Sequence, residues 1–182
     1  MNDEKLEHFH PTTKEQWRTW LEKHHLKKDA VWLIHSKQNS GKPVLSWSDA
    51  VDEALCFGWI DSKGVSIDEF TFKKYYCKRK PNSTWSKVNK EKVKKLIKDN
   101  KVVDAGLNCI KVAKQNGSWT ILDDVERLII PPDLAKELKS KLTARFRDLS
   151  KSVQKSHLQD LVLAKTKETR SKRIRRIVEK LS

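Results

Sequence analysis

The stretch ALCFGWID, residues 54–61, places a thiol and a carboxylate within six positions of each other. Cys56 is a candidate nucleophile, and Asp61 is a candidate acid or base. Cys56 falls in the last turn of an expected helix that ends at Gly58, where the negative end of the helix dipole disfavours a thiolate. No His lies within twenty residues of Cys56 on either side, so the local sequence offers no base to activate it. The pattern therefore favours a buried structural cysteine, and we assign no catalytic residue.

Asp61 lies on the strand expected after that helix, on the same face as Trp59. A carboxylate in this position caps a turn, pairs with a basic residue or faces a cleft. We favour a salt bridge and keep Asp61 as a member of a candidate ligand site. One alternative function makes Asp61 the acid or base of an enzyme acting on a small anionic substrate.

Residues 79–89, RKPNSTWSKVN, are the best candidate for a small-ligand site. Pro81 fixes the entry to a helix whose start is expected at one of two serines, and free backbone N–H groups at a helix start bind anions. A phosphate or a carboxylate fits such a site, and an amide one helical turn after the Trp would hold a loop or the ligand. The predicted anion-binding residues are Arg79, Lys80, Ser83, Trp85, Ser86 and Asn89, with Asp61 nearby.

Residues 73–101 form the most basic segment, with twelve Lys or Arg against Glu91 and Asp99. Aromatic residues lie among them. In nucleic-acid-binding proteins, basic side chains bind phosphates and aromatic side chains stack on bases. A solvated helix face explains the same pattern, and the chain has no RNP, KH or zinc-finger signature. The alternative of nucleic-acid binding would use this surface and the basic C-terminal helix. Its principal residues would be Lys87, Lys90, Lys94 and Lys98.

A long helix is expected over residues 152–181, apolar at both ends and polar in its middle. The polar middle of such a helix is either exposed to solvent between two packed ends, or its polar side chains pack into a network. We favour an ion-pair network that could meet Asp61 from the other part of the chain, with a site shared between the two parts as the alternative. The residues of that network are Lys165, Glu168, Thr169, Arg170 and Arg173.

The elements that must position these residues change in character along the chain. Helical and alternating apolar patterns predict a few-stranded antiparallel sheet with helices in residues 1–118. Strand signals stop after that, and residues 119–182 read as an all-α module ending in a long helix. The predicted fold class is α+β, with a small mixed N-terminal part and a helical C-terminal module.

The net charge and the number of cysteines narrow the class of protein. The net charge of +15 is uneven, +4 in residues 1–90 and +11 in residues 91–182, so polyanions are attracted. Three cysteines without a CxxC predict reduced thiols in a cytoplasmic protein. We expect no secretory signal, no membrane span, no metal site and no cofactor, because no pattern for any of them is present. The sequence sets no oligomeric state.

Three motifs together resemble the YdeI/OmpD-associated family, also called bacteriocin-protection proteins. They are EALCFGWID, RKPNSTWSKVN and AKTKETRSKRI, and the resemblance runs from Trp17 to Leu181. One departure is Lys78, where the family pattern has Pro before the Arg of the second motif. The resemblance implies a helical C-terminal module and a role in tolerance of antimicrobial peptides or bacteriocins, and it supplies no reaction or ligand.

The first hypothesis for function is a cytoplasmic, non-catalytic binding protein for an anionic small molecule or an acidic partner. Its role would be bacteriocin or antimicrobial-peptide tolerance, or stress. Because a protein of charge +15 repels cationic peptides, it would not sequester them directly. Charge reversal at Arg79 and Lys80 would abolish ligand binding without unfolding. Nucleic-acid binding and an enzyme on a small anionic substrate are the two alternatives.

Overall fold

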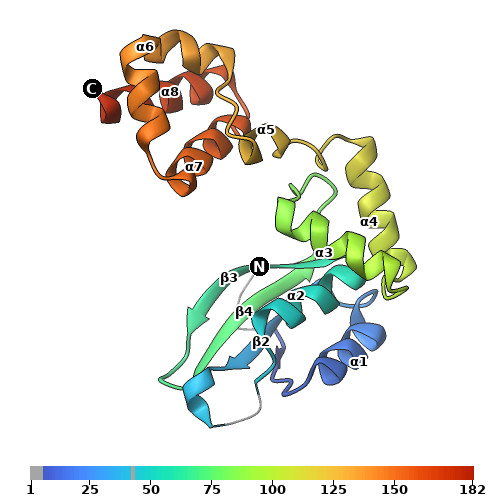
Figure 1. Ribbon diagram of the computed structural model, residues 1–182. Coiled ribbons are helices and arrows are strands. Elements are labelled where there is room, and N and C mark those ends of the chain that lie inside the picture. Colours follow the sequence, from blue (N-terminus) through green and yellow to red (C-terminus); the bar gives the residue numbers. More distant parts are fainter. Residues whose placement is uncertain (1–5, 42–43) are drawn as a thin grey trace. The chain divides into compact units, whose positions relative to one another are not determined.

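The structure is a computed structural model that describes residues 6–41 and 44–182. It has a four-stranded sheet with helices in the N-terminal part and helices alone in the C-terminal part (Figure 1). This is the predicted α+β fold. The chain divides into two compact units, unit 1 with residues 1–83 and 88–118, and unit 2 with residues 84–87 and 119–182. In the described ranges no helix is long and apolar enough to cross a membrane.

Unit 1 contains the sheet and four of the helices, although the first residue of α3 belongs to unit 2. Its elements in chain order are β1 (His8–Phe9), α1 (Lys14–His24), β2 (Ala30–Ser36), the 3-10 helix η2 (Gln38–Ser40), α2 (Trp47–Cys56), β3 (Trp59–Ser66), β4 (Thr71–Lys78), α3 (Lys87–Lys98) and α4 (Asp104–Gln115).

The strand order is β1-β2-β4-β3, and β4 pairs antiparallel with both β2 and β3. These three strands are the predicted antiparallel sheet. The short strand β1 adds a parallel edge next to β2, which the sequence analysis does not predict. Two residues are too few to show the alternation by which a strand is recognised.

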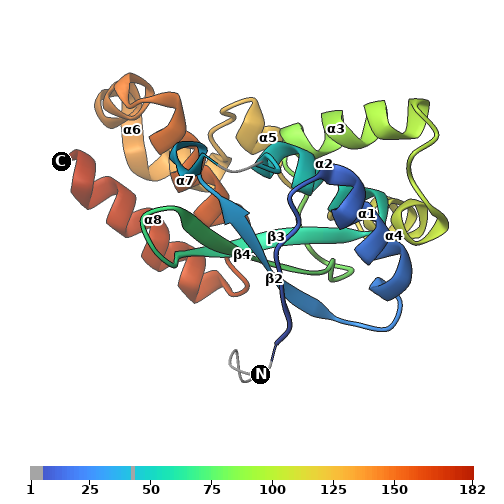
Figure 2. The same ribbon diagram turned by 90° about the horizontal axis from the view of Figure 1, so that it is seen from below.

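Helices α1 and α2 lie on one face of this sheet (Figures 1 and 2). Trp17 of α1 meets Tyr76 of β4 edge-on with ring centroids 5.5 Å apart, and its indole N–H donates to the backbone oxygen of Ala50 at 3.0 Å. Trp20 meets Trp59 in the same manner at 5.8 Å. Stacked and edge-on aromatic rings therefore fill the space between the two helices and the sheet.

Hydroxyl side chains cap the first two α-helices of unit 1. The side chain of Thr13 accepts from Gln16 N at the start of α1, and that of Ser46 accepts from Asp49 N at the start of α2. Asp104 is the first residue of α4, and the cap position is Val103. An acidic residue in the first turn still interacts favourably with the helix dipole.

Two glycines allow the close approach of α4 to the end of α2. Gly58 has φ +72°, so it ends α2 in the left-handed region as predicted. A Cβ on Gly106 would lie only 2.4 Å from the backbone oxygen of Cys56. Because a side chain does not fit there, α4 packs directly on the backbone of the ALCFGWID segment.

Unit 2 is helical. Its elements are α5 (Asp123–Glu126), α6 (Pro132–Asp148), α7 (Lys151–Val162) and α8 (Lys167–Leu181). Helix α6 is interrupted at Lys139, where φ is +51°. The side chains at the centre of this unit are fully or almost fully buried, and they include Leu134, Leu138, Phe146, Leu158 and Leu161.

The single helix predicted for residues 152–181 is wrong, because the structure has α7 and α8 with a break between them. Thr166 has extended φ and ψ angles, and its hydroxyl accepts a hydrogen bond from Thr169 N, so it caps a new helix. The polar middle of the predicted helix thus forms the exposed turn between α7 and α8 together with the first turn of α8. The module still ends in a helix of 15 residues.

Candidate functional site

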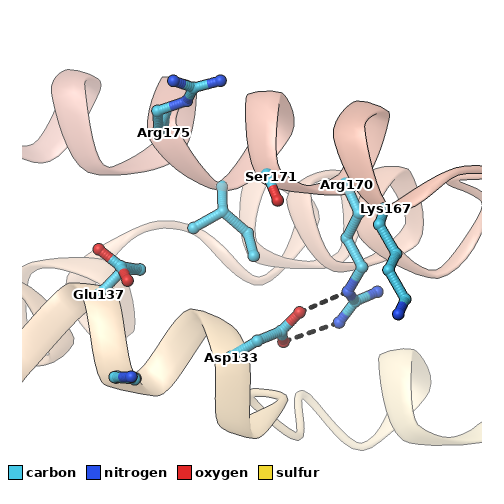
Figure 3. Close-up of a pocket in the computed structure, with 8 residues that line it drawn as sticks. Asp133, Glu137, Lys167, Arg170, Ser171 and Arg175 are labelled. Carbon is cyan, nitrogen blue, oxygen red and sulfur yellow. Dashed lines mark hydrogen bonds and ion pairs between the residues drawn. The ribbon is translucent and has the colours of Figure 1, made fainter.

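The candidate site is a groove of about 670 Å³ in unit 2, between α6 and α8 (Figure 3). Figure 3 shows Lys167 and Arg170 directed to the side of α8 on which Asp133 and Glu137 of α6 lie, whereas the guanidinium of Arg175 points away from α6. Its lining residues are Asp133, Lys136, Glu137, Lys167, Arg170, Ser171, Ile174 and Arg175. The volume is in the range of small-ligand sites, about 300–1,000 Å³.

A two-point ion pair joins the two walls of the groove. Arg170 Nε donates to Asp133 Oδ2 at 2.5 Å, and Arg170 Nη2 donates to Asp133 Oδ1 at 2.8 Å. The third guanidinium nitrogen, Nη1, donates to the backbone oxygen of Leu161 at 2.8 Å. The hydrogen bonds from Arg170 hold the pKa of the Asp133 carboxyl below its usual value. One side chain therefore fixes α6, α8 and the end of α7 relative to one another.

The first turns of both helices take part in the groove, since Asp133 is the second residue of α6 and Lys167 the first residue of α8. A helix start carries a partial positive charge from backbone N–H groups that have no partner within the helix. Thr166 satisfies one of these groups, that of Thr169. The other backbone N–H groups at these helix starts give this end of the groove a positive electrostatic potential, which favours an anion.

Three cations of the lining form no ion pair with any residue that the structure describes. In the described ranges, the only ion pair among the lining residues is that of Arg170 with Asp133. Lys136, Lys167 and Arg175 are exposed, and Glu137 is the single remaining carboxylate. The lining thus contains three positive side chains against one negative side chain, on walls that the Arg170 fork holds in place, and two of the three, Lys136 and Lys167, are lysines.

The predicted anion-binding residues at 79–89 are divided between the two units. Arg79, Lys80, Ser83 and Asn89 belong to unit 1, and Trp85 and Ser86 belong to unit 2. Arg79 is buried, and burial lowers the pKa of its guanidinium to about 10. Lys80 is exposed, and Asn89 lies half-buried in the first turn of α3. In unit 2 the ring of Trp85 packs on that of Trp119, with centroids 4.9 Å apart.

The turn that follows Arg79 is held by residues that the sequence analysis does not mention. Asn116 Nδ2 donates to the backbone oxygen of Pro81 at 2.9 Å and to Asn82 Oδ1 at 3.1 Å. The hydroxyl of Ser118 donates to the same Pro81 oxygen at 3.3 Å. The Pro81 turn is therefore tied to the end of α4, within unit 1.

Asp61 has its partners inside unit 1. Its Oδ2 accepts hydrogen bonds from Lys74 Nζ at 3.0 Å and from Trp47 Nε1 at 2.9 Å. Lys74 Nζ also lies 4.3 Å from the ring centroid of Trp47. The favoured salt bridge is therefore present, and it holds an indole that is 53% exposed.

The network residues of the C-terminal segment find partners within their own module. Arg170 pairs with Asp133, and Arg173 donates to the backbone oxygen of Asp160. Thr169 bonds to Thr166, and Lys165 and Glu168 are exposed. Hydrogen bonds at the start of α8 lower the pKa of Glu168, as expected for a carboxylate there. These contacts build the start of α8, which is one wall of the groove.

Cys56 is fully buried, and burial raises the pKa of its thiol to about 11. The thiol therefore stays protonated at neutral pH, and the reading of Cys56 as structural fits this environment. Among the described residues, no three His, Cys, Asp or Glu side chains lie together in a way that could hold a metal ion.

Part of the basic segment 73–101 serves internal contacts. Lys74 pairs with Asp61, Lys78 with Asp29 and Lys92 with Asp52. Lys73 Nζ lies 4.6 Å from the ring centroid of Trp32. The residues of the nucleic-acid alternative lie along α3, where Lys87, Lys94 and Lys98 are exposed and Lys90 is half-buried.

Two known families match different parts of the chain, and the division between the two matches is close to the boundary between the two compact units. A family described as "Domain of unknown function (DUF8412)" matches residues 9–109, more than half of the chain. The chain belongs to this family. A second family, described as "Bacteriocin-protection, YdeI or OmpD-Associated", matches residues 127–182, which contain the whole groove. The predicted family resemblance is therefore confirmed for residues 127–182 of this DUF8412 member, which contain the motif AKTKETRSKRI. The other two motifs, EALCFGWID and RKPNSTWSKVN, lie in the part that matches DUF8412.

Neither the curated proteins nor the solved structures contain a significant match to the chain. Six groove residues were not singled out from the sequence, namely Asp133, Lys136, Glu137, Lys167, Ser171 and Arg175. The spacing of Lys167, Ser171 and Arg175, four residues apart, would have shown one wall on a single helix face. Nothing in the sequence pairs that face with α6.

Proposed function

We propose that this DUF8412 member is a non-catalytic binding protein whose C-terminal module binds an anionic ligand or partner in the α6–α8 groove. The observation that carries the proposal is that Lys136, Lys167 and Arg175 line one groove with no ion-pair partner in the described parts of the chain. The cellular role would be the bacteriocin protection that the description of the matching family names.

The rigidity of the walls supports binding rather than mere solubility. Solvated lysines on a mobile surface gain little from an anion, because ordering long side chains costs entropy. Here the fork between Arg170 and Asp133 already fixes the two helices, and the helix starts add a field of the same sign. An anion in the groove therefore meets two helices whose arrangement is fixed before it arrives.

The charge of the whole chain directs the proposal to acidic partners. At +15 the chain repels cationic antimicrobial peptides, so protection would act through an anionic ligand or by regulation. A cytoplasmic location is part of the proposal, supported by three cysteines that form no disulfide. The residues predicted at 79–89 remain a second proposed contact for the same ligand class.

The test measures binding of fluorescent poly-L-glutamate to the full chain by anisotropy at about 0.15 M salt, a condition that screens weak surface attraction. The variant Lys167→Glu/Arg175→Glu reverses two charges inside the groove. The matched control Lys141→Glu/Lys151→Glu reverses two exposed charges of unit 2 outside it. We expect the groove variant to weaken binding about tenfold or more and the control to stay within about threefold.

Equal losses in the two variants would show that the charge acts generically, and an absence of binding would reject the proposal. Labelled single- and double-stranded oligonucleotides serve as a second probe. Tighter binding of an oligonucleotide, lost on charge reversal at Lys87, Lys90 and Lys94, would favour the nucleic-acid alternative. A steep fall of its affinity with salt would identify phosphate contacts.

A further inference from the structure

A cavity in unit 1 is lined from the end of β2, the start of β4 and the start of α2, three elements that are labelled in Figure 1. Its volume is about 340 Å³, at the lower end of the range for small-ligand sites, about 300–1,000 Å³. It shares no lining residue with the α6–α8 groove or with residues 79–89. The residues that line it are Ser36, Lys37, Gln38, Val44, Leu45, Ser46, Trp47 and Phe72.

Two aromatic rings of this lining are fixed by contacts with their neighbours. Phe72 stacks on the buried imidazole of His35, with ring centroids 4.9 Å apart and an angle of 9° between the planes. The indole of Trp47 is held by its hydrogen bond to Asp61 and by the ammonium of Lys74, although about half of the side chain is exposed. An exposed ring that is already ordered loses little conformational entropy when a ligand packs on it, so the Trp47 indole is suited to stacking.

The charged and hydroxyl groups of the lining are engaged within the protein. Among the described residues of the lining, Lys37 is the only charged one, and its Nζ donates to Asp68 O at 2.8 Å and to Ser66 Oγ at 3.3 Å. The hydroxyl of Ser46 accepts from Asp49 N at 3.0 Å and donates to Asp49 Oδ2 at 2.6 Å. An anionic ligand would have to compete with the contacts of Lys37, so the cavity offers an anion little gain.

A cationic ligand is disfavoured for a different reason. The ring of Trp47 already binds the ammonium of Lys74, whose Nζ lies 4.3 Å from the ring centroid, and a second cation near this ring would be repelled. The amide of Gln38 forms no hydrogen bond within the described ranges. The lining therefore combines two fixed rings and aliphatic side chains with one uncharged polar group that is available to a ligand.

From these contacts we infer that the cavity binds a small uncharged aromatic molecule, whose ring packs on Trp47 and Phe72 and whose polar group meets the amide of Gln38. Apolar and aromatic walls with a few placed polar groups are typical of small-molecule sites. The inference goes beyond the proposed function and does not depend on it, because this site lies in the sheet-containing unit and takes a different class of ligand.

The experiment titrates four probes of similar size into the isotope-labelled full chain at about 0.15 M salt and follows amide and indole N–H chemical shifts. p-Cresol is uncharged and aromatic, 4-methylbenzoate and 4-methylbenzylamine carry a negative and a positive charge, and 4-methylcyclohexanol lacks the aromatic ring. We expect p-cresol to shift the signals of residues 36–38, 44–47 and 72 with a common dissociation constant of about 1 mM or lower. At these residues it should bind about threefold or more tightly than each of the other probes.

The variant Trp47→Leu keeps the lining apolar and removes the ring. p-Cresol should then bind about threefold or more weakly, whereas 4-methylcyclohexanol should keep its affinity. Leu26→Ala is the control, because Leu26 is an exposed apolar side chain of unit 1 outside the lining. Val44→Asp is a second variant at an exposed position of the lining. Its carboxylate would lose water to a bound ring, so it should weaken p-cresol by a similar factor.

Shifts by p-cresol that spread over the chain or do not saturate would overturn the inference. Binding of 4-methylbenzoate or 4-methylbenzylamine at residues 36–38, 44–47 and 72 as tight as that of p-cresol would overturn it as well, and so would equal effects of Trp47→Leu and Leu26→Ala. Each of these results leaves the proposed function standing, because the α6–α8 groove is tested separately with poly-L-glutamate and its charge-reversal variants.

Discussion

At the scale of single residues, Arg170 is the side chain on which the groove depends most. It contacts three helices, since it pairs with Asp133 of α6 and with the last turn of α7 from its own position on α8. Only a guanidinium makes both bonds of the fork and the third bond at once. The residue was singled out by the sequence for a network, and the structure gives it partners in its own module.

The substitution Arg170→Lys tests this role. Lysine cannot make the two-point pair, so we expect the free energy of unfolding to fall by about 1 kcal/mol, a value reduced because both side chains are partly exposed. The control Arg175→Lys removes a guanidinium that forms no ion pair in the described ranges, and it should change stability by less than about 0.5 kcal/mol. Urea unfolding of both variants provides the measurement, and equal effects would contradict the role of the fork.

His35 should make the stability of the chain sensitive to mild acid. Burial lowers the pKa of its imidazole, against a hydrogen bond with Leu45 O that raises it. The folded state then binds fewer protons than the unfolded state below the usual His pKa of about 6.5, so this contribution to stability is present above that pH and is lost as the pH falls.

We expect His35→Phe, which keeps a ring stacked on Phe72, to depend less on pH than the wild type between pH 7.5 and 5.5. His24→Phe, at a partly exposed site, is the control for replacing an imidazole by a phenyl ring. The measurement is urea unfolding at several pH values. An unchanged dependence in His35→Phe would show that the imidazole does not control acid sensitivity.

At the scale of elements, the ALCFGWID segment owes its character to the packing of α4 on α2. Gly106 lets the α4 backbone reach Cys56 O, which also accepts a hydrogen bond from Val103 N at 3.1 Å. The segment that looks most like a catalytic motif is therefore a helix junction, closed by Gly58 at one side and Gly106 at the other.

Gly106→Ala should destabilise this junction. The new methyl group would lie 2.4 Å from Cys56 O and 2.7 Å from Val102 Cγ1, so α4 must shift, at a cost of about 1–3 kcal/mol. Gly64→Ala is the control, because its methyl group would meet only ordinary contacts at 3.5 Å or more. Thermal unfolding should show a clear fall for Gly106→Ala, whereas a similar effect of both changes would contradict the account.

The elements that repeat a clear pattern could be predicted from the sequence. An apolar, β-rich run at residues 30–36 predicts β2, and alternation at residues 70–78 predicts β4. Hydroxyl residues, Thr12 or Thr13 and Ser46 or Ser48, predict the starts of α1 and α2. The break between α7 and α8 was missed because its polar residues continue the helical composition, and only the extended angles of Thr166 reveal a cap. The groove was missed for a different reason, since α6 and α8 meet through tertiary packing of Leu134 and Ile174 that no local pattern encodes.

At the scale of the whole molecule, the two family matches and the two compact units describe a chain with a sheet-containing part and a helical module. The excess of positive charge is largest in the second half, which includes the module that matches the bacteriocin-protection family. Long-range attraction by the whole charge would bring acidic partners close, and the fixed groove would select among them.

The central claim is that this groove is where anions bind, and amide chemical shifts of the isotope-labelled full chain test it directly. Poly-L-glutamate is titrated at about 0.15 M salt. We predict shifts concentrated at residues 132–138 and 166–176, with saturation at a common affinity. Shifts concentrated at residues 79–89, or spread evenly over the exposed lysines, would contradict the claim.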